Sequence, residues 1–269
     1  MASAATSRVQ VDLERPLPLA AELERSTPNR GEGYTNTLRA LFSIDMIILF
    51  VASTCGIGGT LTVIDNLGQI GRALGYPSST ATTFISLVSI WSYLGQVASG
   101  SETFLSKYKF PRRPLMFSLV LLLSCFGHLL IAFGVPNSLF VASVIIGFSF
   151  GAQGRLLFAI ISEIFSLNYY STLYNFGALA SPVGMYILDM NVAGRLYKQE
   201  ALKQMEAKGL ERLPGEDLTC TGVECYKKAF IVITAVTVFG CVVSLVLVIR
   251  RWKVREQAAT AAEGANGVV

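Results

Sequence analysis

The run AFIVITAVTVFGCVVSLVLVI, from Ala229 to Ile249, decides the class of structure because it contains no charged residue. A helix needs roughly 20 apolar residues to cross the hydrocarbon core of a bilayer, where no water can satisfy backbone polar groups. The run therefore predicts a membrane-spanning helix. Arg250 and Arg251 follow it directly, and basic residues favour the cytoplasmic end of such a helix.

Five more apolar stretches precede this run and approach the same length. The complete set predicts spanning helices at residues 41–64, 81–100, 115–133, 139–161, 171–188 and 229–249. The fifth stretch is the weakest, because Asn175 and Pro182 lie inside it. We therefore predict an all-α protein, an integral membrane six-helix bundle surrounded by the lipid bilayer.

The remaining segments are polar. We predict a polar N-terminal tail or linker over residues 1–34, a transmembrane domain over 35–250 with a long loop at 190–228, and a C-terminal tail over 251–269. The long loop alternates acidic and basic residues, which is typical of a solvated segment. Glu200 to Leu210 has the composition of a helix, so a short helix there is the alternative.

The overall composition agrees with a membrane protein and excludes several classes of function. Apolar residues make up 52% of the chain and charged residues only 15%, whereas soluble domains carry about 25% charged residues. The net charge of +4 is modest and spread along the chain, which does not suggest nucleic acid binding. His128 is the one histidine, and no nucleophile elbow, phosphate loop or paired-cysteine ladder is present. We expect no enzyme activity, no metal site and no cofactor.

Six spans place both termini on one side of the membrane. Basic residues are almost evenly divided between the two sides, so they do not decide the orientation alone. Cys220 and Cys225 are the only cysteines in a polar loop, and a disulfide between them requires an oxidising compartment. Together with the weight of the early segments, this pair predicts cytoplasmic termini. Two free thiols are the alternative if the loop faces the cytosol.

Two of the predicted helices share a glycine pattern. Residues 56–61 read GIGGTL and residues 151–156 read GAQGRL, so both follow Gly-x-x-Gly-x-Leu three helices apart. Transporter folds are often built from inverted three-helix repeats, with binding sites where glycine-interrupted helices occupy corresponding positions. Close helix packing is the alternative for these glycines. The spacing of Gly147 and Gly151 predicts a helix contact inside the bundle rather than between two copies.

Arg155 is the single residue that most strongly indicates a functional site, because a charge deep in a membrane helix needs water or a partner. We predict that it anchors an anion or carboxylate in a cavity, and snorkelling or pairing with Glu163 is the alternative. The predicted cavity-lining residues are Thr54, Gly56, Gly59, Gln153 and Arg155. Asp45 is expected at the interface or paired with Arg39, and His128 is expected to be packed and hydrogen-bonded.

Longer strings of the sequence resemble a known family. They are SIDM (43–46), CGIG (55–58), VIDNLGQI (63–70), LVSIW (87–91), KYKFP (107–111), GHLLIAF (127–133), YYSTLYNF (169–176), ASP (180–182) and VAG (192–194). From about Tyr34 to Arg250 the chain resembles plant nodulin-like transporters of the nuclear-fusion-defective-four type, a branch of the major facilitator superfamily. The similarity covers only the C-terminal half of that family.

The resemblance implies half of a major-facilitator fold, a 3+3 inverted repeat whose first and fourth helices line the solute cavity. An N-terminal six-helix half, or a second copy of the chain, would complete that cavity. The chain departs from the family pattern in two places. Gly154 and Arg155 stand where Trp-Pro is usual, and Gln96 stands where an arginine is usual, in a joint that is shortened around Ser99 to Glu102.

Two functional hypotheses follow, and they belong to different classes. The leading one is half of a major-facilitator-type secondary transporter for an unidentified small solute. The alternative is a truncated, non-transporting paralogue that binds or regulates a membrane partner. The two hypotheses differ in whether six more helices precede Met1.

Overall fold

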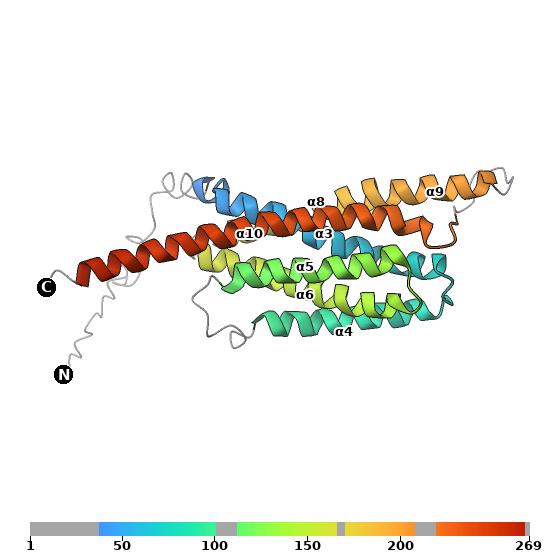
Figure 1. Cartoon of the computed structure of the whole chain (residues 1–269), viewed down its shortest axis with the longest axis horizontal. Helices are drawn as coiled ribbons and strands as arrows, with labels where there is room; N and C mark the ends of the chain where they lie inside the picture. The colour runs from blue at the N-terminus through green and yellow to red at the C-terminus, as the bar shows by residue number, and fades with distance from the viewer. Residues whose placement is uncertain (1–37, 101–111, 166–169, 208–218, 267–269) are drawn as a thin grey trace, which may run out of the picture. The chain divides into compact units, whose positions relative to one another are not determined.

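The computed structural model describes residues 38–100, 112–165, 170–207 and 219–266, and within these ranges every regular element is a helix (Figure 1). The chain divides into two units, Met1–Arg39 and Ala40–Val269. The second unit contains all the elements discussed below. The predicted N-terminal tail at residues 1–34 lies outside the described residues.

Helix α3 spans Ile44–Ala73 and is the longest of the first helices, with 30 residues and a length of about 45 Å. It begins at Ser43, whose hydroxyl accepts a hydrogen bond from the Met46 amide at 3.3 Å. It continues without a break through the glycines that were expected to interrupt it. The Thr60 and Thr62 hydroxyls donate to carbonyls of the preceding turn, so the backbone there stays helical and exposes no free carbonyl.

The next three helices follow the predicted runs closely. Helix α4 spans Thr80–Gly100, α5 spans Arg112–Phe133 and α6 spans Ser138–Ile164. A short turn joins α5 to α6, with Gly134 and Asn137 in the left-handed region at φ 55° and 61°. Glycine tolerates this conformation freely and asparagine is the next best residue.

Four helices are long and apolar enough to cross a membrane by length and composition: Ile44–Ala73, Arg113–Phe133, Ser138–Ile164 and Glu224–Gln257. The second and fifth predicted spans do not meet this standard, so it supports four of the six predicted spans. Helix α4 is long enough but carries many serines and threonines. The fifth segment is long enough only when several shorter helices are joined end to end.

The fifth segment is built from four short helices in succession. They are α7 at Tyr170–Ala178, α8 at Ala180–Met185, the π-helix η3 at Tyr186–Ala193 and α9 at Gly194–Ala207. Pro182 has no amide hydrogen to donate, so the helix cannot run evenly through this region. The Asn191 side chain bonds to the Tyr186 carbonyl at 2.9 Å, five residues earlier, which suits the wider π-helical turn.

The loop predicted over 190–228 is wrong for its first part, because α9 is helical to Ala207. Its residues are mostly strong helix formers. Tyr197, Ala201 and Gln204 recur at helical spacing and contact the rest of the unit. The helix therefore has a face to bury, which a solvated loop does not need.

The C-terminal tail predicted over 251–269 is also corrected. Helix α10 spans Glu224–Asn266, so the last apolar run and most of the tail form one helix of 43 residues. Arg251 and Arg255 on its polar part form ion pairs with acidic residues of α3 and α6. These ion pairs stabilise the part of α10 that extends beyond the apolar run.

Small residues bring the helices into backbone contact. Helices α4 and α6 run parallel, since Val88 meets Gly147 and Ser92 meets Gly151. A Cβ atom added to Gly151 would lie 1.9 Å from the Ser92 carbonyl oxygen, and one added to Gly147 would lie 2.6 Å from the Val88 oxygen. The predicted Gly147–Gly151 contact inside the bundle is confirmed. Gly58 of α3 and Gly184 of α8 also pack closely, since a Cβ atom added to Gly58 would lie 2.7 Å from the Gly184 Cα atom.

The glycines of α6 offer a matched test of this packing. Gly151→Ala places a methyl group against backbone that cannot move aside, so we expect it to destabilise the fold by about 1–3 kcal/mol. Gly154→Ala meets nothing within 4 Å and should be neutral or stabilising by up to about 1 kcal/mol, because alanine favours the helix. Thermal unfolding in detergent can be followed with a dye that reacts with the buried thiols of Cys55, Cys125 and Cys241. Equal stability of the two variants would contradict the close contact.

Candidate functional site

An open cleft of about 580 Å³ lies between α4 and α6, with the start of α7 at one end. Its walls include Gln96, Ser99 and Gly100 from α4, Phe150, Gly151, Gly154, Arg155 and Phe158 from α6, and Tyr170 and Tyr174 from α7. The volume is within the usual range of small-molecule sites, roughly 300–1,000 Å³. The glycines of α6 make room for it where larger side chains would fill the space.

Among the described residues that line this cleft, Arg155 is the one that carries a charge. Its side chain is exposed, and no described residue forms an ion pair or hydrogen bond with it. The sequence-based alternative paired it with Glu163. That pairing is wrong, because Glu163 interacts with Arg113 at 3.8 Å and with Arg255.

Ion pairs mark one end of the bundle and show how deep Arg155 lies. Asp45 binds Arg250 at 2.9 Å and Arg251 at 2.6 Å, rather than Arg39. Glu163 belongs to the same polar level through Arg255 on α10. Arg155 comes eight residues before Glu163 on α6, or about 12 Å further toward the middle of the helix. A guanidinium at that depth needs water or an anion.

The exposed surface of α4 carries a polar stripe that the sequence analysis missed. It consists of Thr82, Ser86, Ser89, Tyr93 and Gln96, all of them exposed. The steps of four, three, four and three residues place them on one face of the helix. The adjacent exposed face is apolar, with Ile85, Ile90, Leu94 and Val97. The signal was present in the sequence, because the second apolar run is amphipathic at helical spacing.

Members of the stripe differ in how much they need water. The Ser86 and Ser89 hydroxyls donate to carbonyls one turn earlier, each at 2.9 Å, and such hydroxyls can face lipid. The Gln96 side chain makes no hydrogen bond to a described residue, and the amide cannot satisfy itself on its own helix in this way. The stripe therefore has more side-chain polar atoms without a hydrogen-bond partner, which need water, at the end that meets the cleft.

Gln96 and Arg155 lie at the same level of the α4–α6 pair. The contacts of Val88 with Gly147 and of Ser92 with Gly151 are both offset by the same number of residues, and the next step in that register joins position 96 to position 155. Both residues line the cleft. The two departures from the family pattern thus meet in one place.

The five predicted cavity residues lie in different parts of the bundle and contact different neighbours. Gly56 and Gln153 are together, since a Cβ on Gly56 would lie 2.9 Å from the Gln153 side-chain oxygen. Both are buried inside the bundle. Gly59 faces His128 and Thr237, and Thr54 bonds to the Phe50 carbonyl at 2.8 Å beside α8.

Arg155 points away from Gln153 because two residues on a helix are about 200° apart. Gln153 is fully buried, and its amide atoms have no partner among the described groups. The structure therefore does not join all five predicted residues in one space. It separates a buried pair, Gly56 and Gln153, from the open cleft of Arg155.

His128 is packed, as expected, with no exposed surface and its ring stacked on Phe230 at 6.2 Å. The expected hydrogen bond is not well formed. The ring lies beside the backbone of Gly59, but neither nitrogen makes a well-formed bond to a described group.

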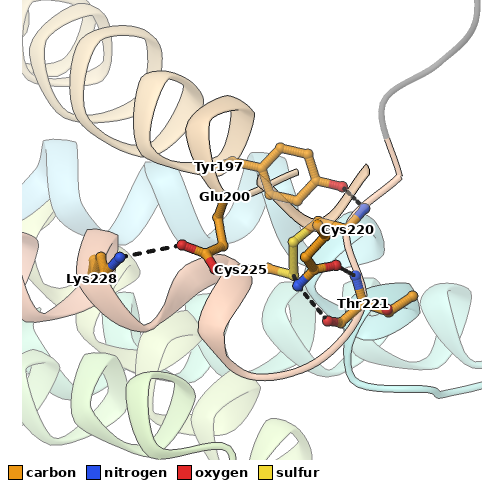
Figure 2. Close-up of a disulfide and its surroundings, with 7 residues drawn as sticks. Tyr197, Glu200, Cys220, Thr221, Cys225 and Lys228 are labelled. Carbon is orange, nitrogen blue, oxygen red and sulfur yellow. Dashed lines mark hydrogen bonds and ion pairs between the residues drawn. A yellow bond between two sulfur atoms is a disulfide. The ribbon is translucent and has the colours of Figure 1, made fainter. Parts of the chain in front are cut away.

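The opposite end of the bundle is closed by a cap that includes a disulfide between Cys220 and Cys225 (Figure 2). The Cys220 amide donates to the Tyr197 hydroxyl at 3.1 Å. The Gln204 side chain accepts from the Thr221 amide at 3.0 Å and donates to the Thr221 carbonyl at 2.9 Å. Lys228 of α10 pairs with Glu200 of α9 at 3.2 Å. These contacts dock α9 on the start of α10.

The helices, the polar groups at both ends of the bundle and the apolar exposed surface define a class, the α-helical membrane proteins that cross the bilayer several times. A comparison with family models matches residues 35–256 to NFD4, C-terminal domain. The chain belongs to this family.

Two curated relatives are similar over most of the chain. "Protein NUCLEAR FUSION DEFECTIVE 4" from Arabidopsis thaliana is 27% identical over 223 residues, which cover 81% of this chain and 36% of the relative. "Probable transporter MCH1" from Yarrowia lipolytica is 22% identical over 235 residues, or 84% of this chain and 46% of the relative. The chain thus spans less than half the length of these curated relatives.

The cap gives a prediction about the cysteines. Protein isolated without reductant should yield a Cys220–Cys225 linked peptide in mass spectrometry, with Cys55, Cys125 and Cys241 as free thiols. Loss of the bridge in a Cys220→Ser, Cys225→Ser variant should cost about 2 kcal/mol of stability at most, because a short loop removes little chain entropy. Reductant should destabilise the native chain and leave the double variant unchanged. Five free thiols in the untreated protein would contradict the cap.

Proposed function

We propose that this chain is half of a major-facilitator-type secondary transporter and moves a small solute. Membership of the NFD4 C-terminal domain family supports a membrane role. One relative is named a probable transporter, and the chain matches 46% of its length, which is the share expected for one of two similar halves. No catalytic grouping competes with this proposal in the sequence.

The helix order supports a division into two three-helix repeats. In this proposal α3, α4 and α5 form the first repeat, and α6, the α7–η3 segment and α10 form the second. The second helix of each repeat, which is α4 in the first and the α7–η3 segment in the second, is not among the four helices that meet the length and composition standard for a membrane span. This would make six spans in all, with α9 lying beyond the membrane.

The observation that carries the proposal is the unpaired Arg155 in a cleft that continues the polar stripe of α4. A charged group and an uncovered polar face are costly against lipid. Both are tolerable if they line a watery path. A second half, on a longer chain or in a second copy, would cover the opposite side of that path.

A second candidate function is a non-transporting membrane partner. It is favoured by the exposed polar stripe of α4, which no described element covers. In this case the polar face of α4 would contact a partner rather than a solute. The uptake experiment below separates the two functions.

The cap also supports an orientation. A disulfide forms in oxidising compartments, so in this proposal the Cys220–Cys225 end faces away from the cytosol. The ion-pair end, with Asp45, Arg250 and Arg251, then faces the cytoplasm, in agreement with its basic residues. Both ends of the transmembrane domain would be cytoplasmic.

Single cysteines at the two ends test this topology. Gln199→Cys on α9 and Lys253→Cys on α10 replace exposed residues, and the native thiols are either buried or bridged. We expect an impermeant thiol reagent to label position 199 from the non-cytoplasmic side and position 253 from the cytoplasmic side. Labelling of both from the same side would rule out the proposed orientation and the single crossing of the membrane by α10 between the two positions.

Uptake into vesicles tests the transport proposal. Purified protein is reconstituted in liposomes, which are incubated with a mixture of small metabolites and analysed by mass spectrometry of their contents. We expect at least one solute to accumulate above the level of protein-free vesicles. Arg155→Gln should lower that accumulation roughly tenfold or more, since it removes a charged contact made to the solute. Accumulation of no solute at all would contradict transport by this chain and favour the partner function.

A further inference from the structure

We propose that the cleft between α4 and α6 selects small organic anions that carry one carboxylate on a flat apolar body. This inference rests on the proposed function for its biological use, but the binding itself can be measured without transport. It is carried by three features of the cleft. They are its single positive charge, its aromatic wall and its uncommitted polar groups.

The charge of the cleft decides the sign of the ligand. Arg155 lines it, and within residues 38–100, 112–165 and 170–207 no aspartate or glutamate does. Glu163, the acid nearest along α6, is held by Arg113 and Arg255. A guanidinium binds a carboxylate through two parallel hydrogen bonds. One unpaired arginine therefore favours one carboxylate over a neutral or positively charged group.

The wall beside Arg155 decides the shape of the ligand. Phe158 and Tyr174 stack with ring centroids 4.0 Å apart and planes inclined by 24°. Tyr170 extends the wall, with its ring centroid 5.8 Å from that of Tyr174. Flat apolar groups pack well on such surfaces. The ligand would place its carboxylate on Arg155 and its flat body against these rings.

Polar groups at the rim are available for a hydrogen bond to the ligand. Gln96 of α4 also lines the cleft, and its side chain has no hydrogen-bond partner in the described ranges. The Ser99 and Ser162 hydroxyls already donate to the Gln96 and Ala159 carbonyls, each at 2.9 Å. Each of these hydroxyls has one hydrogen and cannot donate again, so further donors come from the Gln96 amide and the hydroxyls of Tyr170 and Tyr174.

Three probes of similar size test the selectivity: benzoate, benzamide and protonated benzylamine. They share a phenyl ring and differ in charge. Binding of each to the full chain in nanodiscs of uncharged lipid is measured by equilibrium dialysis. We expect benzoate to bind about tenfold or more tightly than benzamide, because only benzoate carries a carboxylate that can pair with the Arg155 guanidinium. We expect benzylamine not to bind measurably, because its charge is positive.

Variants then assign the charge. Arg155→Gln should weaken benzoate binding about tenfold or more, whereas Arg195→Gln, which removes an exposed arginine of α9, should leave it unchanged. Gln96→Arg combined with Arg155→Gln moves the charge across the cleft at the same level of the two helices. We expect this double variant to recover much of the affinity for benzoate. Thermal unfolding of each variant confirms that it is folded.

Equal affinities for benzoate and benzamide would overturn the inference, and so would undiminished benzoate binding by a folded Arg155→Gln variant. Transport is judged separately. Arg155-dependent benzoate binding without uptake of any solute would support this site and contradict the proposed transport function. Uptake that survives Arg155→Gln and is not inhibited by benzoate would support transport and overturn the anion site.

Discussion

Backbone contact between α4 and α6 sets the geometry on which the cleft depends. Gly147 and Gly151 let the two helices touch along one register, because side chains of any size at these positions would collide with carbonyls of α4. In water such contacts compete with hydrophobic packing, but in lipid close backbone approach is itself a main source of helix association. The same register brings Gln96 beside Arg155 and opens the space lined by Gly154.

The two ends of the bundle are held by different chemistry, which fits two different environments. Carboxylates of Asp45 and Glu163 gather four arginines from α5 and α10 at one end. Ion pairs of this kind are worth little when fully exposed but more at a partly buried helix end. The other end uses a disulfide, neutral hydrogen bonds and the single ion pair of Lys228 with Glu200 to dock α9 on α10 (Figure 2). Between them the exposed surface of the described residues is mostly apolar, and its polar residues lie on α4, on α7 and at Arg155 of α6.

The sequence predicted the helical class, the approximate bounds of the apolar runs and the two cysteines that the structure joins. It offered a helix at Glu200 to Leu210 only as the alternative to a solvated loop, because alternating charges hid the spacing of Tyr197 and Ala201 that docks α9. Nor could it show that α3 remains helical through its glycines, since that depends on what packs against them. The opposite directions of Gln153 and Arg155 follow from helical geometry alone. Grouping them in one cavity overlooked that spacing, whereas the partners of Asp45 and Glu163 required the tertiary fold.

The central claim of this account is that the polar stripe of α4 faces water within the membrane and leads to Arg155. The most direct measurement is a cysteine scan from position 82 to position 97, with a charged thiol reagent applied to the protein in sealed membranes. The account predicts rapid labelling at positions 82, 86, 89, 93 and 96, and slow labelling at 85, 90, 94 and 97. Labelling without this helical period, or strongest at the apolar positions, would contradict it.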